Sequence, residues 1–218
     1  MRVKYIIFDL DGTLIDSSDG VVAAVNYSLR QMGQPERTAD DIKPFIGYSL
    51  RLMYPSFTDV PYEELHRHFQ TKAAETVVSS TVVLPGVEDT LRDLAARGYR
   101  LAIASTKIKR HIQGIIDKFN WKDLISAYAG GDEVTHVKPH PEILLLTLKR
   151  LSANPDETVV VGDTINDIEA ARMVPMTSVA VNSPYGGTER LLKSKPDFFV
   201  ESIADVPGIL NRLQKEAI

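Results

Sequence analysis

Short runs of apolar residues, most of them rich in Val and Ile, alternate along the chain with longer stretches of mixed polarity. Several runs are apolar at consecutive positions, so both faces of a strand would be buried, as in the central strands of a parallel sheet. The runs that predict strands are Val3–Leu10, Tyr99–Ala104, Ser126–Ala129, Thr158–Val161, Thr177–Val181 and Asp197–Val200.

From residue 85 onward, apolar residues at helical spacing lie between these runs. Gly98 and Asn120 stand where the first two of these helices would end. The helices predicted from the spacing begin at Pro85 or cover Ile108–Phe119, Pro139–Leu151, Asn166–Met173 and Ala204–Glu216. Alternating strands and helices favour βαβ units, so the sequence predicts an α/β fold with an open parallel sheet.

Residues 17–80 break this alternation. Helical patterns begin there after Ser17, which can cap the first helix, and again after Thr38. No run in this stretch predicts a strand. The sequence therefore predicts an all-helical domain of residues 17–80, inserted after the first strand of an α/β core domain formed by residues 1–16 and 81–218.

Composition narrows the class of protein. A chain of 218 residues can bury a core without disulfides, and the absence of Cys excludes thiolate nucleophiles and Cys-ligated metal sites. The formal net charge of −4 argues against a nucleic-acid partner or an anionic membrane surface. The start of the chain does not resemble a signal peptide, and no apolar run is long enough to span a bilayer, so we expect a cytoplasmic protein.

The first expected strand ends in the sequence Asp9–Thr13, which holds two carboxylates one residue apart. Ligands gather at the carboxyl ends of strands in open parallel sheets. Two carboxylates this close repel each other unless a cation lies between them or one is protonated, and oxygen ligands suit Mg²⁺. The alternative is a tight turn in which Asp and Gly serve only the backbone.

Two other expected strands also end in polar residues. Ser105 and Thr106 follow one, where hydroxyl groups can bind a phosphate or simply cap a helix. Asp163 follows another directly after a glycine, and Asp167 stands in the first turn of the next helix, a position that acids favour in any case. Lys138 lies between the last two of these strand ends, and the prolines after it fix the chain before the next helix, although lone lysines are usually solvated.

Together these residues resemble the haloacid dehalogenase superfamily of phosphohydrolases. Its four motifs are matched in order, by Asp9–Thr13, by Ser105, by Lys138, and by Asp163 with Asp167. The insertion resembles the C1 helical cap of the phosphoglycolate phosphatase-like group. The resemblance implies a Rossmann-like sheet with a topological switch between the first and fourth strands, and a cis bond between Lys138 and Pro139.

The resemblance also implies a mechanism. Asp9 would be the nucleophile that forms an aspartyl-phosphate, and Asp11 would protonate the leaving oxygen and then activate water. The Mg²⁺ cofactor would be held by Asp9, the main-chain carbonyl of Asp11, and Asp163. The phosphoryl oxygens would be bound by Ser105, Thr106 and Lys138. Asp167 would orient either the metal shell or Lys138, and Thr13 would support the first loop.

The helical cap would exclude water and contact the leaving group. Candidate substrate-binding residues there are Lys43, Tyr48, Arg51 and Tyr54. Arg51 could pair with a substrate carboxylate, or it could lie on a solvated helix face.

These inferences predict a Mg²⁺-dependent phosphatase acting on a small phosphorylated metabolite such as phosphoglycolate, as a monomer or homodimer without nucleic-acid or membrane partners. The alternatives are a phosphomutase of the β-phosphoglucomutase type or a pyrophosphatase on the same scaffold. A non-catalytic binding protein is a further alternative, but it would not need both Asp9 and Asp11.

Overall fold

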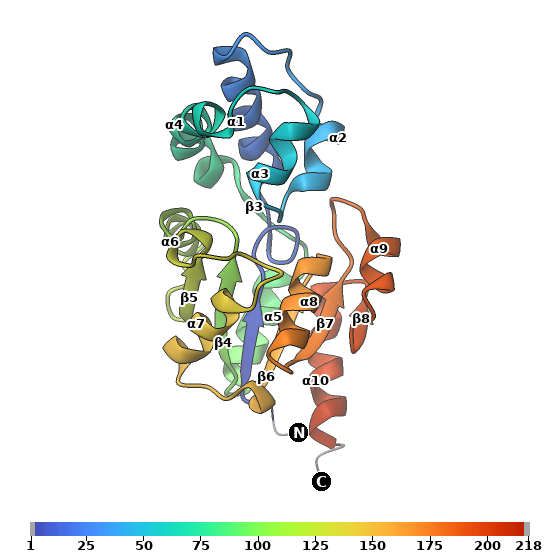
Figure 1. Ribbon diagram of the computed structural model, residues 1–218. Coiled ribbons are helices and arrows are strands. Elements are labelled where there is room, and N and C mark those ends of the chain that lie inside the picture. The colour runs from blue at the N-terminus through green and yellow to red at the C-terminus, as the bar shows by residue number, and fades with distance from the viewer. Residues whose placement is uncertain (1–2, 216–218) are drawn as a thin grey trace.

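The computed structural model describes residues 3–215, and a parallel six-stranded sheet forms its centre (Figure 1). In spatial order the strands are β5 (Ile125–Gly130), β4 (Arg100–Ser105), β1 (Tyr5–Phe8), β6 (Thr158–Gly162), β7 (Thr177–Val181) and β8 (Phe198–Val200). β1 pairs with both β4 and β6, so the expected topological switch is confirmed.

Helices cover both faces of the sheet because side chains alternate along each strand. Ile6 and Phe8 of β1 pack into one apolar cluster with α5, α6 and α10, while Ile7 packs into a second cluster with α7 and α8. The core helices are α5 (Val87–Ala96), α6 (Lys109–Lys118), α7 (Glu142–Leu151), α8 (Ile165–Met173), α9 (Thr188–Lys193) and α10 (Val206–Lys215). The short 3₁₀ helices of the chain are η1 (Lys43–Phe45), η2 (Tyr54–Ser56), η3 (Gly131–Glu133), η4 (Pro155–Glu157) and η5 (Ile203–Asp205).

The core departs from the predicted elements at a few points. α7 begins at Glu142, after the two prolines, and not at Pro139 as predicted. The predicted cis bond between Lys138 and Pro139 is confirmed. α9 was not predicted, because a helix of six residues with Leu191 as its buried apolar side chain gives little periodicity. The predicted end of the last helix, Glu216, lies outside the described residues.

The inserted segment forms a helical cap beyond the carboxyl ends of the strands (Figure 1). Its helices are α1 (Ser18–Gln31), α2 (Ala39–Ile42), α3 (Leu50–Met53) and α4 (Tyr62–Ser80). They enclose an apolar cluster of their own that includes Leu29, Met53 and Leu65. The chain enters through β2 (Ile15–Asp16) and returns through β3 (Val82–Val83), which pair antiparallel and hold both connections together.

Ser17 corrects one local prediction. It precedes α1, but its side chain makes no capping hydrogen bond and donates to the carboxylate of Asp11 instead. Across the described residues 3–215, none of the helices is long and apolar enough to cross a membrane.

Candidate active site

The carboxyl ends of β1, β4 and β6 bring the predicted residues of the core together. Phe8, the last residue of β1, lies in register with Ile103 on β4 and Val161 on β6. The amide of the next residue, Asp9, donates to the carbonyl of Val161 at 2.8 Å. This extra hydrogen bond holds the Asp9 side chain at the sheet edge, beside the ends of the two neighbouring strands.

Lys138 occupies the centre of the site. Its ammonium group donates to Asp9 Oδ1 at 2.6 Å, to Asp167 Oδ1 at 2.5 Å and to the carbonyl oxygen of Ala104 at 3.1 Å. Its side chain is only 2% exposed, which excludes a solvated lysine. Burial alone would lower the pKa of Lys138, but Asp167 and Asp9 outweigh it and raise that pKa above its usual value. Lys138 is therefore a fixed positive charge.

Burial raises the pKa of Asp9 to about 7, with Lys138 opposing the shift and Asp167 adding to it. Among the described residues, Lys138 is the one donor to the Asp9 carboxylate, and it uses Oδ1. Oδ2 is therefore left without a protein hydrogen-bond donor. An uncommitted carboxylate oxygen at a strand end is what a nucleophile requires.

The carboxylate of Asp163 accepts hydrogen bonds from two hydroxyl groups and is not paired with a cation of the described residues. Thr13 donates to its Oδ1 at 3.1 Å and Ser183 donates to its Oδ2 at 2.6 Å. Burial, followed by the charges of Asp9 and Asp167, raises the pKa of Asp163 well above its usual range. Gly12 permits this approach, since it has φ +82° and a Cβ there would lie 2.1 Å from Asp163 Oδ2.

Asp167 both caps its helix and binds the central lysine. Its Oδ2 accepts hydrogen bonds from the amide of Thr164 at 3.0 Å and from the Thr164 hydroxyl at 2.7 Å, which caps α8. Its Oδ1 accepts the hydrogen bond from Lys138. A Cβ on Gly162 would lie 2.4 Å from the Asp167 side chain, so the glycine before Asp163 makes room for this carboxylate.

Asp9, Asp163 and Asp167 are buried, and one carboxylate oxygen of each lies within 4.8 Å of one oxygen of each of the others. Among residues 3–215, Lys138 is the one cation paired with this set, and it pairs with Asp9 and Asp167 but not with Asp163. The charge of the three acids is therefore only partly balanced. Hard carboxylate oxygens are the ligands that Mg²⁺ and similar divalent cations prefer. The donor set therefore fits a divalent cation.

Asp11 points away from this cluster. Its Oδ1 accepts from the hydroxyl of Ser17, and its Oδ2 lies 3.1 Å from the ammonium group of Lys107. The Lys107 side chain is 7% exposed, so this is a buried ion pair. The second acid of the Asp9–Thr13 motif therefore has surroundings different from those of the first.

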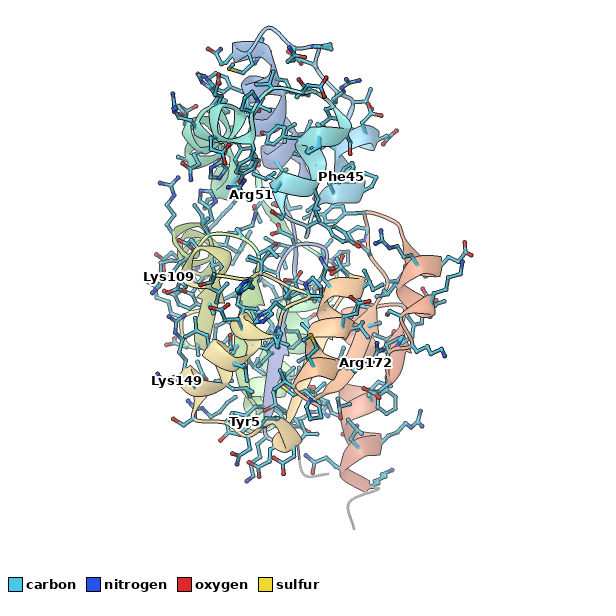
Figure 2. The ribbon with its side chains drawn as sticks, in the orientation of Figure 1. Tyr5, Phe45, Arg51, Lys109, Lys149 and Arg172 are labelled. Carbon is cyan, nitrogen blue, oxygen red and sulfur yellow. The ribbon has the colours of Figure 1, made fainter. Side chains whose placement is uncertain are left out.

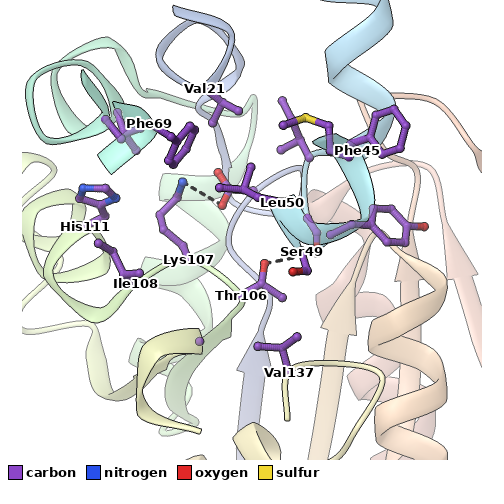
Figure 3. A pocket seen from close by; sticks show the side chains of 18 of the residues that line it. Val21, Phe45, Ser49, Leu50, Phe69, Thr106, Lys107, Ile108, His111 and Val137 are labelled. Atoms are coloured by element: carbon purple, nitrogen blue, oxygen red, sulfur yellow. Dashed lines mark hydrogen bonds and ion pairs between the residues drawn. The ribbon is translucent and has the colours of Figure 1, made fainter. Parts of the chain in front are cut away.

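Ser105 and Thr106 lie at the same sheet edge. Ser105 is buried, and its hydroxyl accepts from the amide of Lys107 at 3.2 Å, as in an ordinary turn. The Thr106 hydroxyl donates to the carbonyl of Gly47 in the cap at 3.3 Å (Figure 3). In this structure Thr106 therefore links the core to the cap.

Comparisons with known proteins identify the family of this chain. The family model described as "Haloacid dehalogenase-like hydrolase" matches residues 6–181, which include every core residue of the site except Ser183. The chain is a haloacid dehalogenase-like hydrolase. It is 31% identical to "Probable phosphatase IndB" of Dickeya dadantii, over 96% of this chain and 94% of that protein.

Other members of the family are similarly close. The chain is 31% identical to a phosphoglycolate phosphatase of Salmonella typhimurium, over 94% of this chain and 91% of that protein. The crystal structure of a predicted phosphoglycolate phosphatase from Haemophilus somnus superposes with a TM-score of 0.85 at 27% identity, covering 96% of this chain and 98% of that one. This hydrolase is thus a phosphatase with a helical cap.

A cavity of about 310 Å³ separates the cap of the hydrolase from its core (Figure 3). Asp11, Thr106 and Lys107 line it from the core, and Tyr48 is the predicted cap residue that lines it. Because Asp11 reaches the cavity wall, the cavity adjoins the predicted acid of the reaction.

The other predicted cap residues do not line the cavity. Arg51 lies at the end of the cap nearest the core (Figure 2), but its side chain is 63% exposed. Its guanidinium group lies 3.1 Å from the carboxylate of Glu63 and 3.9 Å from the centroid of the Tyr62 ring. Of the two expected arrangements, Arg51 therefore adopts the one on a solvated helix face. Lys43 is absent from the cavity lining, and Tyr54 is buried in the cap core.

Two residues of the site had no predicted role. Lys107 lies two positions after Ser105, just before α6. Nothing in this position indicates that its side chain pairs with Asp11. Ser183 lies twenty residues beyond Asp163, and its proximity depends on β7 pairing with β6. Neither contact has a local sequence pattern.

Proposed function

We propose that this hydrolase is a Mg²⁺-dependent phosphatase that cleaves a small-molecule phosphate monoester through an aspartyl-phosphate on Asp9. The observation that carries the proposal is the asymmetric environment of Asp9. Lys138 fixes its Oδ1 at 2.6 Å, whereas its Oδ2 has no donor among residues 3–215. The carboxylate is thus oriented by one oxygen and free to react through the other.

The first step forms a bond between an Asp9 oxygen and phosphorus and breaks the bond from phosphorus to the ester oxygen. In the substrate complex Asp11, at the cavity wall, would leave Lys107 and carry a proton, which it gives to the departing alcohol. In the second step, water attacks the phosphorus and passes a proton to Asp11, and the bond to Asp9 breaks to release phosphate. Splitting the displacement in this way replaces one difficult step with two easier ones.

The remaining residues bind and balance charge. Lys138 and the hydroxyl of Ser105 would bind the phosphoryl oxygens, with Thr106 joining them once its hydroxyl leaves Gly47. Mg²⁺ would be held by Asp9, Asp163 and the main-chain carbonyl of Asp11. When bound, it supplies positive charge that lets an anionic ester approach an anionic carboxylate.

We also propose the domain division expected from the sequence, with residues 17–80 as a cap over a core of residues 1–16 and 81–218. The paired β2 and β3 would serve as the hinge between them. Opening at this hinge would separate Gly47 from Thr106 and admit the substrate.

The test is phosphate release from a panel of monoesters, with and without Mg²⁺, by the wild-type protein and the Asp9→Asn variant. Asp123→Asn is the matched control, because Asp123 is exposed and precedes β5, at the opposite end of the strands from the site. We expect Mg²⁺-dependent release that Asp9→Asn reduces at least ~1000-fold, as for other covalent nucleophiles, and that Asp123→Asn leaves unchanged. Equal rates in Asp9→Asn and wild type would refute the proposal. Formation of an isomeric sugar phosphate in place of phosphate would indicate the mutase.

A further inference from the structure

The cavity between cap and core adjoins the reacting groups on one side and the cap core on the other. Asp11 and Lys107 line its floor, and residues of α1, α3 and α4 form its roof (Figure 3). A group that leaves from a phosphorus atom near Asp9 would enter this space. We propose that the cavity selects phosphate monoesters of uncharged, largely apolar alcohols, an inference that rests on the proposed function.

Apolar side chains make up much of the cap side of the cavity. Apolar lining residues contributed by the cap include Val21, Phe45, Leu50, Met53, Phe69 and Val77. Leu50 and Phe69 face the same space from different helices in Figure 3. Such a surface gains from the burial of an aliphatic or aromatic group. The polar side chains of the cap lining are Tyr48, Ser49, Tyr62, His66 and Gln70. None of them is a lysine or arginine, so they offer hydrogen bonds but no permanent positive charge to a carboxylate or phosphate.

The charged residues of the lining do not favour an anion. They are Asp11, Asp132 and Lys107, so acids outnumber bases. The Lys107 ammonium group lies 3.1 Å from Asp11 and also contacts the hydroxyl of Ser17 at 3.4 Å. Arg51 lies outside the lining and pairs with Glu63. The leaving group of phosphoglycolate or pyrophosphate would thus meet no unpaired cation of the cap among the described residues.

The two histidines of the lining do not alter this balance. Burial, with Arg51 adding to it, lowers the pKa of His66. Burial, with Lys107 adding to it, lowers the pKa of His111 to about 4. Both rings are therefore neutral at pH 7 and can form hydrogen bonds without providing a positive charge.

His111 adds one specific feature. Its side chain is buried, and Nε2 has no hydrogen-bond partner in the part of the chain that the structure describes. Buried polar atoms normally have a partner. Nε2 has almost no accessible surface, so a ligand reaches it only when the ring turns toward the cavity. A hydroxyl or carbonyl group on an otherwise apolar alcohol would then supply the partner. The size of the cavity fits such a ligand, since 310 Å³ corresponds to roughly ten water molecules, more than glycolate would displace.

The first experiment compares kcat/KM with Mg²⁺ for benzyl phosphate, 4-carboxybenzyl phosphate, phosphoglycolate and pyrophosphate. The two benzyl esters differ by one carboxyl group far from the reacting bond. We expect benzyl phosphate to exceed each of the other three by at least ~10-fold, the size of effect that a single misplaced group produces in an apolar pocket. Equal or better turnover of phosphoglycolate or pyrophosphate, or no loss from the added carboxyl group, would overturn the inference alone. No turnover of any ester would overturn the proposed function with it.

The second experiment places a cation in the cavity. Leu50→Arg adds one to the lining, and Leu52→Arg adds the same charge to the same helix at a side chain that is 62% exposed. We expect Leu50→Arg to reduce the preference for benzyl over 4-carboxybenzyl phosphate at least ~10-fold, and Leu52→Arg to leave it unchanged. The preference is a ratio, so partial misfolding would not alter it. An unchanged ratio in both variants would contradict the inference.

Discussion

Lys138→Met tests whether a single ammonium group stabilises the buried acids. The substitution keeps an unbranched side chain of similar length but removes the charge that lies 2.6 Å from Asp9 and 2.5 Å from Asp167. Asp9, whose pKa is about 7 even beside Lys138, would take up a proton, and Asp167 would remain buried without a cation. We therefore expect the metal-free protein to lose stability at neutral pH.

The magnitude follows from the geometry. At an effective dielectric constant of about 20, unit charges 2.6 Å apart attract by about 6 kcal/mol. Desolvation of the ions offsets part of this attraction, and removing one partner of a buried pair generally costs about 3–5 kcal/mol. We expect Lys138→Met to lower the free energy of unfolding by that amount. Adding Asp167→Asn to the variant should restore at least about 1 kcal/mol, because it removes one uncompensated charge.

The assay is equilibrium unfolding in urea at pH 7 with EDTA present. Lys4→Met is the matched control, since Lys4 pairs with Glu157 at the surface and is half-exposed. Exposed pairs contribute about 1 kcal/mol or less, so this control should differ little from wild type. If Lys138→Met lowers the free energy of unfolding by less than about 1 kcal/mol, as the control does, Lys138 does not stabilise the buried acids.

Three other substitutions test separate parts of the structure. Asp163→Asn should raise the metal-free melting temperature, because burial and the neighbouring acids disfavour its charged form, and it should abolish any further rise on adding Mg²⁺; a larger Mg²⁺ response would contradict the proposed ligand. Gly12→Ala should cost more than Gly33→Ala in urea unfolding, by at least about 2 kcal/mol, since both glycines have positive φ but only Gly12 faces a side chain at 2.1 Å. His111→Gln should reduce the loss of stability on acidification. The pKa of His111 falls to about 4 on folding, so the wild type loses at most about 2 kcal/mol between pH 6.5 and 5 as the unfolded chain takes up the proton. Parallel pH profiles of variant and wild type would exclude that role.

The sequence predicted the sheet because its central strands are apolar on both faces, a pattern typical of parallel strands that helices cover on each side. It also placed Asp9 and Asp163 together, since the carboxyl ends of parallel strands share one edge. The strand order and the importance of Lys138 came from family resemblance, because no periodicity indicates which strands are neighbours.

The direction in which each side chain points could not be predicted from the sequence. Arg51 was a candidate because of its chemistry, yet packing against Tyr62 and pairing with Glu63 keep it outside the cavity. Ser17 was expected to cap α1, but the buried carboxylate of Asp11 is a stronger acceptor for its hydroxyl. Lys107 was overlooked because its partner Asp11 follows β1, and nothing in the local sequence shows that β1 and β4 are neighbours. Each of these contacts depends on tertiary packing.

The central claim is that Asp9 carries the phosphoryl group during turnover. The most direct measurement uses the Asp11→Asn variant with 4-nitrophenyl phosphate and Mg²⁺, quenched in acid and analysed by peptide mass spectrometry. Nitrophenolate leaves without a proton, whereas attack by water needs the base that the variant lacks, so the intermediate should accumulate. We expect a burst of nitrophenolate with a phosphoryl group on Asp9. Nitrophenolate release with no phosphoryl group on Asp9, or with one on another residue, would contradict the claim.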